Sequence, residues 1–289
     1  MKGLILAGGT GTRLWPITRG ISKQLLPVYD KPLIYYPLST LMLAGIREIS
    51  IITTLLDQQA FKTLLGNGSQ WGLKLNYTVQ DQPNGIAEAF ILASDFIQDS
   101  KVALILGDNI FHGSEVGRNL KNYSEIVGAH VFAQKVANPE EFGVIELDSK
   151  GKAISITEKP KEPKSNYAVT GLYFYDESVS RIAKTMTKSK RGELEISTLN
   201  QEYLERDLLG VTVLPRGTVW LDGGTVESLH DAGEYVRVVE QRQGMKIGCV
   251  EEIAWRNEWI SDEILVELAK PQLPSGYGEY LMKIVEQER

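Results

Sequence analysis

Cysteine, histidine and long apolar runs are scarce in this 289-residue chain, and each scarcity excludes a class of protein. Cys249 is the only cysteine, so the chain can form neither an intramolecular disulfide nor a site built from several thiolates. His112, His130 and His230 stand in no constellation typical of catalysis. No stretch approaches the ~18 apolar residues of a membrane helix, and the apolar start is too short for a signal peptide. We therefore expect a cytoplasmic protein without a membrane partner.

The charge of the chain is acidic overall and unevenly distributed. Lys and Arg number 31 against 37 Asp and Glu, which gives a net charge of −6 and argues against nucleic acid as a partner. Residues 1–31 are nevertheless basic, with five Lys or Arg against Asp30 alone. A basic region in an acidic protein favours a small anionic ligand, although a solvated basic surface would give the same pattern.

Apolar periodicity predicts alternating strands and helices in the first half of the chain. Runs rich in Ile, Val and Leu predict strands over residues 2–7, 48–53, 73–80 and 102–106, and helical patterns cover residues 32–44, 55–65 and 86–97. This order is typical of an α/β protein with a Rossmann-like, mixed but mostly parallel sheet flanked by helices.

The second half is richer in predicted strands. Strand patterns occur at residues 129–136, 144–147, 153–157, 168–175, 210–214 and 219–221, and helical patterns at 178–186, 195–205, 226–242 and along the C-terminal stretch. We expect one domain spanning residues 1–289, with a small β-rich part at about 129–225 and a helical part at about 226–289.

A glycine-rich turn follows the first predicted strand. Gly8, Gly9 and Gly11 allow unusual backbone angles there, so backbone N–H groups can approach an anion without interference from a Cβ atom. The turn lacks the third glycine of a dinucleotide fingerprint and the Gly-Lys-Ser/Thr of a P-loop. It offers Thr12 and Arg13 instead, which indicates a different kind of phosphate site.

Two further polar residues, Lys23 and Gln24, follow in the segment Ser-Lys-Gln-Leu-Leu-Pro. Arg13 can donate to two phosphate oxygens at once, and Lys23 supplies a movable point charge. A glycine turn with a surface arginine is common in α/β folds. Combined with Lys23 and Gln24 at this spacing, it predicts a phosphate-binding site.

These segments resemble the sugar-1-phosphate nucleotidylyltransferases, and within that family the glucose-1-phosphate thymidylyltransferases. The resemblance covers nearly the whole chain, through the motifs at residues 8–16, 23–27, 29–38, 43–47, 107–109, 158–160, 171–176, 191–196, 220–222 and 251–256. It implies that dTTP and glucose 1-phosphate are joined into dTDP-glucose with release of pyrophosphate. It also implies a nucleotide-binding half at about residues 1–128, a sugar-binding half at about 129–225, and a C-terminal interface of a homotetramer built as a dimer of dimers.

The residues suit this type of reaction. A sugar phosphate is already an oxyanion at neutral pH, so its attack on the α-phosphorus needs no general base. The reaction requires charge neutralisation and in-line positioning instead. Arg13 and Lys23 would neutralise the triphosphate, and the amides of the glycine turn would bind its oxygens.

Asp108 and Asp222 each follow a predicted strand, at the position where α/β sheets bind ligands. Two carboxylates together with phosphate oxygens and water suit Mg²⁺. An aspartate after a strand is also commonly a helix cap, so the pattern alone leaves both interpretations open. The resemblance favours the metal, because the metal ligands of the family match these two positions.

The resemblance supplies the sugar-binding residues. It implies that Lys159 contacts the sugar phosphate as a catalytic cation, and that Glu158 and Asn109 bind sugar hydroxyls. It also implies that the backbones at Gly143 and Val169 line the pocket. Two further positions that match the neighbourhood of the sugar phosphate are Arg191 and Glu193.

Residues 80–85, Gln-Asp-Gln-Pro-Asn-Gly, match the loop that reads the base in the family. Gln80 and Gly85 agree with the family pattern, whereas Asp81, Gln82 and Asn84 depart from it. A glutamine amide carries both a donor and an acceptor, which suits the O4/N3 edge of thymine.

Three other functions compete with this interpretation. A sibling enzyme that uses UTP differs only in one methyl group of the base, which is worth ~1–3 kcal/mol. A retaining glycosyltransferase would show Asp-x-Asp after a strand, where this chain has Gly-Asp-Asn at residues 107–109. A non-catalytic nucleotide-sugar sensor would have lost residues such as Arg13, Lys23, Asp108 or Asp222, and all four are present.

Members of the family often carry a second nucleotide-sugar site at a subunit interface. The matching region combines Leu41, residues 111–113, Arg216 and residues 251–256. His112 stands where the family usually has an aromatic residue, and Ser114 and Glu115 add polarity. We expect a second site that binds nucleotide weakly, with plain interface packing as the alternative.

Overall fold

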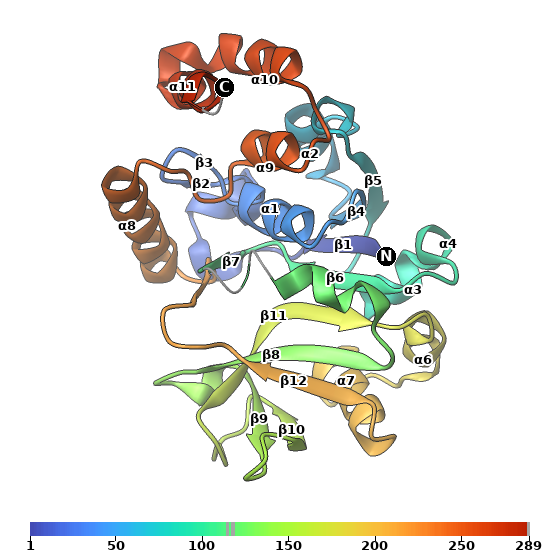
Figure 1. Ribbon diagram of the computed structural model, residues 1–289. Helices are drawn as coiled ribbons and strands as arrows, with labels where there is room; N and C mark the ends of the chain where they lie inside the picture. Colours follow the sequence, from blue (N-terminus) through green and yellow to red (C-terminus); the bar gives the residue numbers. More distant parts are fainter. Residues whose placement is uncertain (114–115, 117–118, 288–289) are drawn as a thin grey trace.

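A nine-stranded sheet forms the centre of the computed structural model, which describes residues 1–113, 116 and 119–287. Its parallel part contains, in spatial order, β6 (Val102–Leu106), β1 (Lys2–Ala7), β4 (Glu48–Thr53) and β5 (Lys74–Val79) (Figure 1). These are the four strands predicted in the first half of the chain. The carboxyl ends of β1 and β6 lie side by side, because Leu6 pairs with Leu106.

The helices between these strands are α1 (Tyr35–Leu43), α2 (Gln58–Leu65), α3 (Glu88–Leu92) and α4 (Ser94–Ile97). Each group begins two or three residues later than predicted. Before α1, Pro32 belongs instead to a small hairpin of β2 (Pro27–Val28) and β3 (Lys31–Pro32). The third predicted helix is interrupted at Ala93, whose φ of −91° and ψ of 12° are not helical.

The β-rich part extends the same sheet. β11 (Tyr167–Tyr175) runs antiparallel to β6, and the strands beyond it are β8 (Ala129–Lys135), β9 (Gly143–Leu147), β10 (Ala153–Glu158) and β12 (Leu209–Val213). Figure 1 shows β9 and β10 projecting at the end of the molecule far from the C-terminal helices. The helices of this part are α6 (Val179–Thr185) and α7 (Ile196–Glu205).

A separate two-stranded ribbon joins β7 (Asn109–His112) to β13 (Val219–Asp222). The antiparallel register places Asp222 opposite Asn109. β13 is predicted from the sequence and β7 is not. Four residues directly after Asp108 give no periodicity of their own, and their strand depends on a partner about a hundred residues further along the chain.

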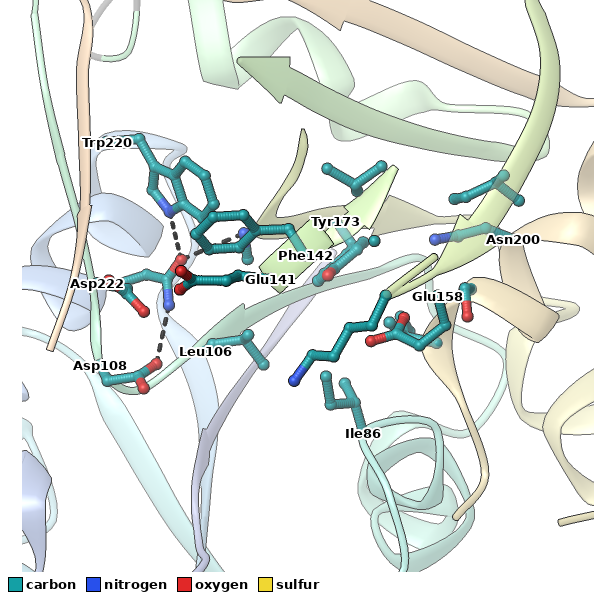
Figure 2. A pocket seen from close by; sticks show the side chains of 18 of the residues that line it. Ile86, Leu106, Asp108, Glu141, Phe142, Glu158, Tyr173, Asn200, Trp220 and Asp222 are labelled. Atoms are coloured by element: carbon teal, nitrogen blue, oxygen red, sulfur yellow. Dashed lines mark hydrogen bonds between the residues drawn. The ribbon is translucent and has the colours of Figure 1, made fainter. Parts of the chain in front are cut away.

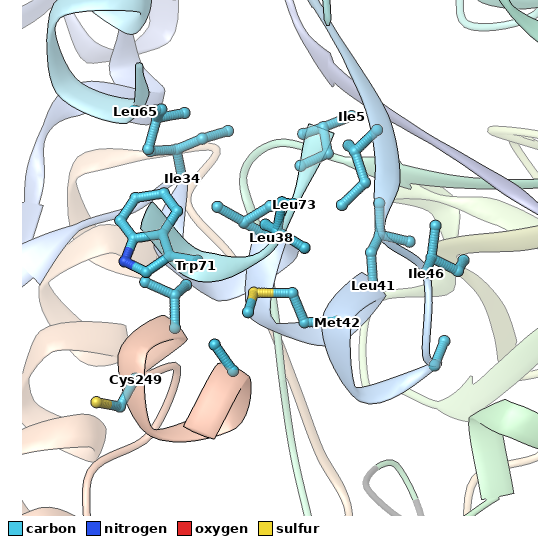
Figure 3. Packing of buried hydrophobic residues seen from close by; sticks show 14 of the residues in the cluster. Ile5, Ile34, Leu38, Leu41, Met42, Ile46, Leu65, Trp71, Leu73 and Cys249 are labelled. Atoms are coloured by element: carbon cyan, nitrogen blue, oxygen red, sulfur yellow. The ribbon is translucent and has the colours of Figure 1, made fainter. Parts of the chain in front are cut away.

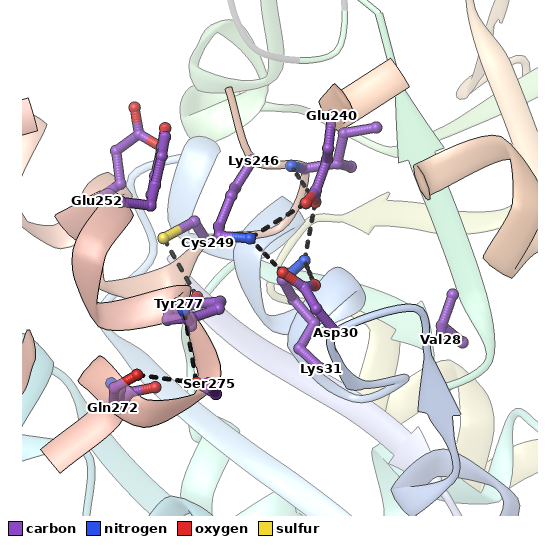
Figure 4. A network of polar contacts seen from close by, with 12 residues as sticks. Val28, Asp30, Lys31, Glu240, Lys246, Cys249, Glu252, Gln272, Ser275 and Tyr277 are labelled. Atoms are coloured by element: carbon purple, nitrogen blue, oxygen red, sulfur yellow. Dashed lines mark hydrogen bonds and ion pairs between the residues drawn. The ribbon is translucent and has the colours of Figure 1, made fainter. Parts of the chain in front are cut away.

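The C-terminal part consists of α8 (Val226–Gln243), α9 (Val250–Arg256), α10 (Asp262–Ala269) and α11 (Tyr277–Gln287). A buried network of charges ties α8 to the β2–β3 hairpin (Figure 4). The Lys31 ammonium lies 2.9 Å from Glu240 and also pairs with Asp30, and Lys246 pairs with the same two carboxylates. Among the described residues, no helix is long and apolar enough to cross a membrane.

Hydrophobic residues pack against both faces of the parallel strands, as expected for a sheet covered by helices on each side. Alternate residues of one strand belong to different clusters: Ile5 and Ile105 pack with α1 and the C-terminal helices, whereas Leu4 and Leu104 pack with α3, α6 and α7. Figure 3 shows the first cluster, in which Leu38, Leu41 and Met42 of α1 contact the sheet. The parallel strands that carry the carboxyl edge are therefore buried on both faces.

His130 on β8 makes the stability of the fold depend on pH. Its Nε2 lies 2.9 Å from the Thr212 hydroxyl of β12, and burial lowers its pKa from 6.5 to about 4. Between these two values the unfolded chain binds a proton that the folded chain does not. Stability should therefore be complete above pH 6.5 and fall as the pH drops towards 4, by up to ~3 kcal/mol.

Urea unfolding at pH 7.5 and pH 5 tests this expectation. The variant His130→Gln should lose less stability between the two values than the unmodified protein, and His230→Gln, at an exposed position, should behave like the unmodified protein. Equal losses in the unmodified protein and in His130→Gln would contradict a titrating His130.

Candidate active site

The glycine turn lies at the carboxyl edge of the sheet, directly after β1. Gly9 and Gly11 have φ values of 95° and 59°, in the left-handed region that favours glycine. Gly8 lies so close to Gln80 that an added Cβ would approach Gln80 Oε1 to 2.9 Å. Thr12 and Arg13 follow on an exposed 3₁₀ turn, so these polar side chains are available to a ligand.

Lys23 and Asp108 form an ion pair beside this turn. Asp108 follows β6. Burial alone would raise the pKa of its carboxyl, but the Lys23 charge and hydrogen bonds, including those from Lys23 and Asn109, together lower it. Gln24 is almost fully buried, and its Oε1 accepts a hydrogen bond of 2.6 Å from Ser22. Gln24 therefore packs beneath the edge of the sheet while Lys23 is partly exposed.

Asp222 at the end of β13 is the second carboxylate of this region. Its pKa is raised, first by burial and then by the negative charge of Asp108, with Lys23 and Arg13 opposing. The Gly223 amide donates to the Asp108 carbonyl over 2.8 Å, which holds the two segments together. Two carboxylates and two cations therefore meet at one place.

Asn109 is held in position by three hydrogen bonds. Its Nδ2 donates to Asp108 Oδ1 over 2.8 Å, and its Oδ1 accepts from the Trp220 indole (2.5 Å) and from the Gly171 amide (3.2 Å). The Trp220 ring packs edge-on against Phe142, with 5.1 Å between ring centroids. This arrangement forms one wall of a cavity of about 230 Å³.

The cavity brings together eight of the predicted site residues. Those that line it are Arg13, Asp108, Asn109, Gly143, Glu158, Lys159, Val169 and Asp222. Figure 2 shows Asp108 and Asp222 at one end and Glu158 and Asn200 at the other. The two ends of the cavity therefore differ chemically: one carries a pair of carboxylates, and the other carries hydrogen-bonding groups.

Glu158 is the last residue of β10, and Lys159 follows it directly. Burial raises the pKa of Glu158, and the Ser197 hydroxyl opposes the shift by donating a hydrogen bond. Lys159 is exposed, with a φ of 39°, and its amide donates to the Phe142 carbonyl over 3.0 Å. That unusual backbone position directs consecutive charged residues to the rim of one cavity.

Arg191 and Glu193 lie beside the cavity rather than in its lining. Arg191 is 3.8 Å from Glu158, 3.6 Å from Glu193 and 3.7 Å from Glu195. Arg191 thus reaches the site through Glu158. The Glu193 carboxylate pairs with Arg191, and the Glu193 carbonyl accepts a hydrogen bond of 2.8 Å from the Ser189 amide.

The segment predicted to recognise the base is close to the glycine turn. Gln80 is buried, and its Nε2 donates to Glu88 over 2.8 Å and to the Gly85 carbonyl over 3.4 Å. Gly85 has a φ of 109° and packs against the backbone of Leu194. Gln80, Gly85 and Gly8 are therefore brought together.

Sequence reasoning missed several residues of the site. Glu141, Tyr173, Ser197 and Asn200 also line the cavity, and Asn200 is fully buried with no partner for its Nδ2 among the described residues. Ser197 and Asn200 are three residues apart on α7, so they share one helix face. In the sequence, the signal is a polar residue, Asn200, on the apolar face of a helical pattern.

The region predicted to form a second nucleotide site is only partly at the surface. Leu41 is fully buried in the core and Glu251 is buried, while Arg216 is exposed.

Polar side chains of this region already have partners within the chain. Glu252 accepts hydrogen bonds from Tyr280 and Arg256, and His112 bonds to the Tyr235 hydroxyl over 2.6 Å. Ser114 and Glu115 lie outside the described residues.

Comparison with known sequences finds a matching family and similar proteins over the full length of the chain. The profile of the family described as nucleotidyl transferase matches residues 2–238. Glucose-1-phosphate thymidylyltransferase of Mycolicibacterium smegmatis is 56% identical over 288 residues, which is 100% of both chains. The protein of the same name from Neisseria meningitidis is 56% identical over 287 residues, 99% of this chain and 100% of its own length.

Solved structures show the same fold. A chain from Bacillus anthracis assigned as a glucose-1-phosphate thymidylyltransferase, crystallised with sucrose, has a TM-score of 0.76 and 43% identity, and covers 82% of this chain and 95% of its own. A UDP-glucose pyrophosphorylase complexed with UDP-glucose has a TM-score of 0.73 and 25% identity, with 82% and 98% covered.

Proposed function

The chain belongs to the nucleotidyl transferase family, and we infer that it transfers a thymidylyl group from dTTP to glucose 1-phosphate. The products are dTDP-glucose and pyrophosphate. The observation that carries this inference is the cavity that joins Arg13, Asp108 and Asp222 at one end to Glu158 and Lys159 at the other. Relatives named glucose-1-phosphate thymidylyltransferase are 51–56% identical over nearly the whole chain, which favours dTTP over UTP as the nucleotide.

In the reaction that we propose, an oxygen of the glucose phosphate attacks the α-phosphorus of dTTP. A new phosphorus–oxygen bond forms, the bond between the α- and β-phosphates breaks, and pyrophosphate leaves with the electron pair. Arg13 and Lys23 would neutralise the triphosphate, and the backbone amides at Gly8, Gly9, Gly11 and Thr12 would bind its oxygens. Lys159, at the opposite rim, would hold the attacking phosphate in line.

The family acts with a metal ion, and Asp108 and Asp222 are the residues that fit it here. Asp222 is half-buried beside Asp108, and a divalent cation would relieve the repulsion between the two carboxylates. No cluster of three or more His, Cys, Asp or Glu in the described ranges could hold a metal. The remaining ligands would therefore come from phosphate and water, which is how Mg²⁺ binds nucleotides. Bound there, Mg²⁺ supplies charge stabilisation at the phosphates.

The sugar would occupy the end of the cavity opposite the two aspartates. Glu158 and Asn109 offer acceptors and donors for hydroxyl groups, and the backbones at Gly143 and Val169 line the same space. Arg191 supports Glu158 from outside, and we place Glu193 with Arg191 as a supporting residue. Gln24 supports the phosphate end from beneath the sheet.

A product assay tests the proposed function directly. The protein is incubated with glucose 1-phosphate, Mg²⁺ and one of dTTP, dUTP, UTP, dCTP or ATP, and pyrophosphate release and product mass are measured. We expect dTDP-glucose at the highest kcat/KM. Preference for UTP would change the nucleotide and leave the reaction type, whereas no pyrophosphate with any nucleotide would refute the proposal.

Gln80→Ala should weaken the use of dTTP far more than that of glucose 1-phosphate. Removing the amide leaves the edge of the base without its partner, so we expect kcat/KM for dTTP to fall by about 10–100-fold with the KM for glucose 1-phosphate almost unchanged. Gln82→Ala, at an exposed position in the same segment, is the matched control. Equal increases in both KM values would indicate a general defect instead of base recognition.

The organisation of the whole chain matches the proposed division of the cavity into a nucleotide end and a sugar end. We propose that residues 1–128 bind the nucleotide, residues 129–225 the sugar, and residues 226–289 other subunits of a homotetramer. Five large apolar side chains of the last part are at least 40% exposed, namely Val226, Val238, Met245, Ile264 and Leu273, which supports an interface there. Both substrates are phosphates of the cell interior, which supports a cytoplasmic location.

A further inference from the structure

The side chain of Gln80 is held by Glu88, a residue that lies outside the motifs described above. Its Nε2 donates to Glu88 Oε2 over 2.8 Å and to the Gly85 carbonyl over 3.4 Å. Both protons of the amide are therefore engaged within the protein. The remaining polar group, Oε1, faces the glycine turn, where an added Cβ on Gly8 would lie 2.9 Å away.

Glu88 holds a second amide with its other oxygen. Asn84 Nδ2 donates to Glu88 Oε1 over 2.9 Å, and the Lys188 ammonium donates to Asn84 Oδ1 over 2.6 Å. The order of groups is therefore ammonium, amide, carboxylate, amide. An ammonium can only donate and a carboxylate can only accept, so the orientation of both amides is determined by chemistry.

We propose that Glu88 is a positioning residue that sets the specificity for the base. It holds Gln80 so that an acceptor, and no donor, is presented towards the glycine turn. This inference rests on the proposed function, in which Gln80 contacts the base of the nucleotide. Thymine and uracil carry an N–H at N3 and can donate to Gln80 Oε1. Cytosine has an acceptor at N3, so two acceptors would face each other.

The arrangement selects by leaving the wrong partner unpaired. A buried acceptor that faces another acceptor loses its hydrogen bond to water and gains nothing in return. The methyl group that distinguishes thymine from uracil lies on a different atom of the ring. Glu88 should therefore govern the choice between dTTP and dCTP, and have no part in the choice between dTTP and dUTP.

The variant Glu88→Gln tests this role, with glucose 1-phosphate and Mg²⁺ in the full-length protein. A glutamine at position 88 can donate as well as accept, so the amide of Gln80 is free to turn over. We expect the ratio of kcat/KM for dTTP to that for dCTP to fall at least ~10-fold. The ratio for dTTP to dUTP should stay within about twofold of the unmodified value.

Glu88→Ala is the second variant, because alanine favours the helix that begins at this residue. It removes the acceptor altogether and should also lower the ratio for dTTP to dCTP. Asp95→Asn, an exposed carboxylate on the adjoining helix α4, is the matched control and should leave both ratios unchanged.

Two results would overturn the proposal. One is an unchanged ratio for dTTP to dCTP in both Glu88 variants, whatever their activity. The other is an equal loss of the two ratios, which would indicate a general distortion of the loop. Failure of the proposed function is separate from both, because it would appear in the unmodified protein as no dTDP-glucose formed from dTTP.

Discussion

Arg13→Ala is expected to lower kcat by about 10²–10³-fold, the usual loss when one stabiliser of transition-state charge is removed. The Arg13 side chain lines the cavity, and an added Cβ on Gly224 would lie 3.3 Å from its guanidinium and 2.8 Å from Asp222. Arg13 is thus on the same side of the site as the two carboxylates. The measurement is the steady-state rate of pyrophosphate release at saturating dTTP and glucose 1-phosphate.

Arg19→Ala is the matched control for this change. Arg19 is exposed on the next 3₁₀ turn, its guanidinium lies 5.6 Å from the Trp15 ring, and it is not among the residues that line the cavity. It removes the same charge and should keep kcat within about twofold. Because Arg13 is exposed as well, both variants should unfold at the temperature of the unmodified protein. A near-normal kcat in Arg13→Ala would refute its role.

Asp222→Asn and Asp108→Asn are each expected to raise the Mg²⁺ concentration needed for half-maximal rate by about 10-fold or more. Each should also lower the saturated rate by roughly 10²-fold, equivalent to ~2.7 kcal/mol of transition-state stabilisation. The two variants should differ in one respect. Asp108→Asn also removes the partner of Lys23, so its affinity for dTTP should change more. The measurement is a Mg²⁺ titration of rate for each variant.

Asp231→Asn serves as the control for the two aspartate variants. This exposed carboxylate borders the adjoining cavity from α8 and is not among the residues that line the site itself. Its Mg²⁺ titration should match that of the unmodified protein. If Asp108→Asn or Asp222→Asn also titrates like the unmodified protein, that aspartate is a structural cap and not a ligand.

The periodicity of apolar residues was sufficient to predict the parallel strands, because each of them shows its own local sequence pattern. The strands β1 and β6 have continuous apolar runs, β4 is interrupted only by Ser50, and the parallel direction of the three follows from the helices between them. The glycine turn and Asp108 could be placed together because both follow strands of one sheet. These inferences need only the period of the sequence and the rule for where such sheets bind ligands.

Contacts between distant segments could not be predicted in this way. The bond from Trp220 to Asn109 joins residues 111 positions apart, and it depends on the ribbon of β7 and β13. The opposite directions of the pKa of Asp108 and Asp222 likewise depend on which of them Lys23 contacts. Identical side chains after similar strands carry no sign of this difference in the sequence.

The orientation of Gln80 is a third example. An amide with a donor and an acceptor was expected at this position, and the residue type alone cannot say which end faces outwards. The answer lies in Glu88, eight residues further along and on a helix that the sequence predicts only as an apolar pattern. Chemistry that depends on a neighbour in space needs the fold before it can be stated.

The pairing of β7 with β13 has a consequence for how such an enzyme can change its substrate. Asp108 and Asp222 are aligned by backbone hydrogen bonds at this ribbon, and the β-rich segment between its two strands contributes most of the cavity end proposed to bind the sugar. The same segment contains β11, which pairs with β6 of the parallel strands, so it is attached to the sheet as well as to the ribbon. We therefore expect a change of sugar preference to arise in the loops of this segment, while its strands and the two aspartates stay in register.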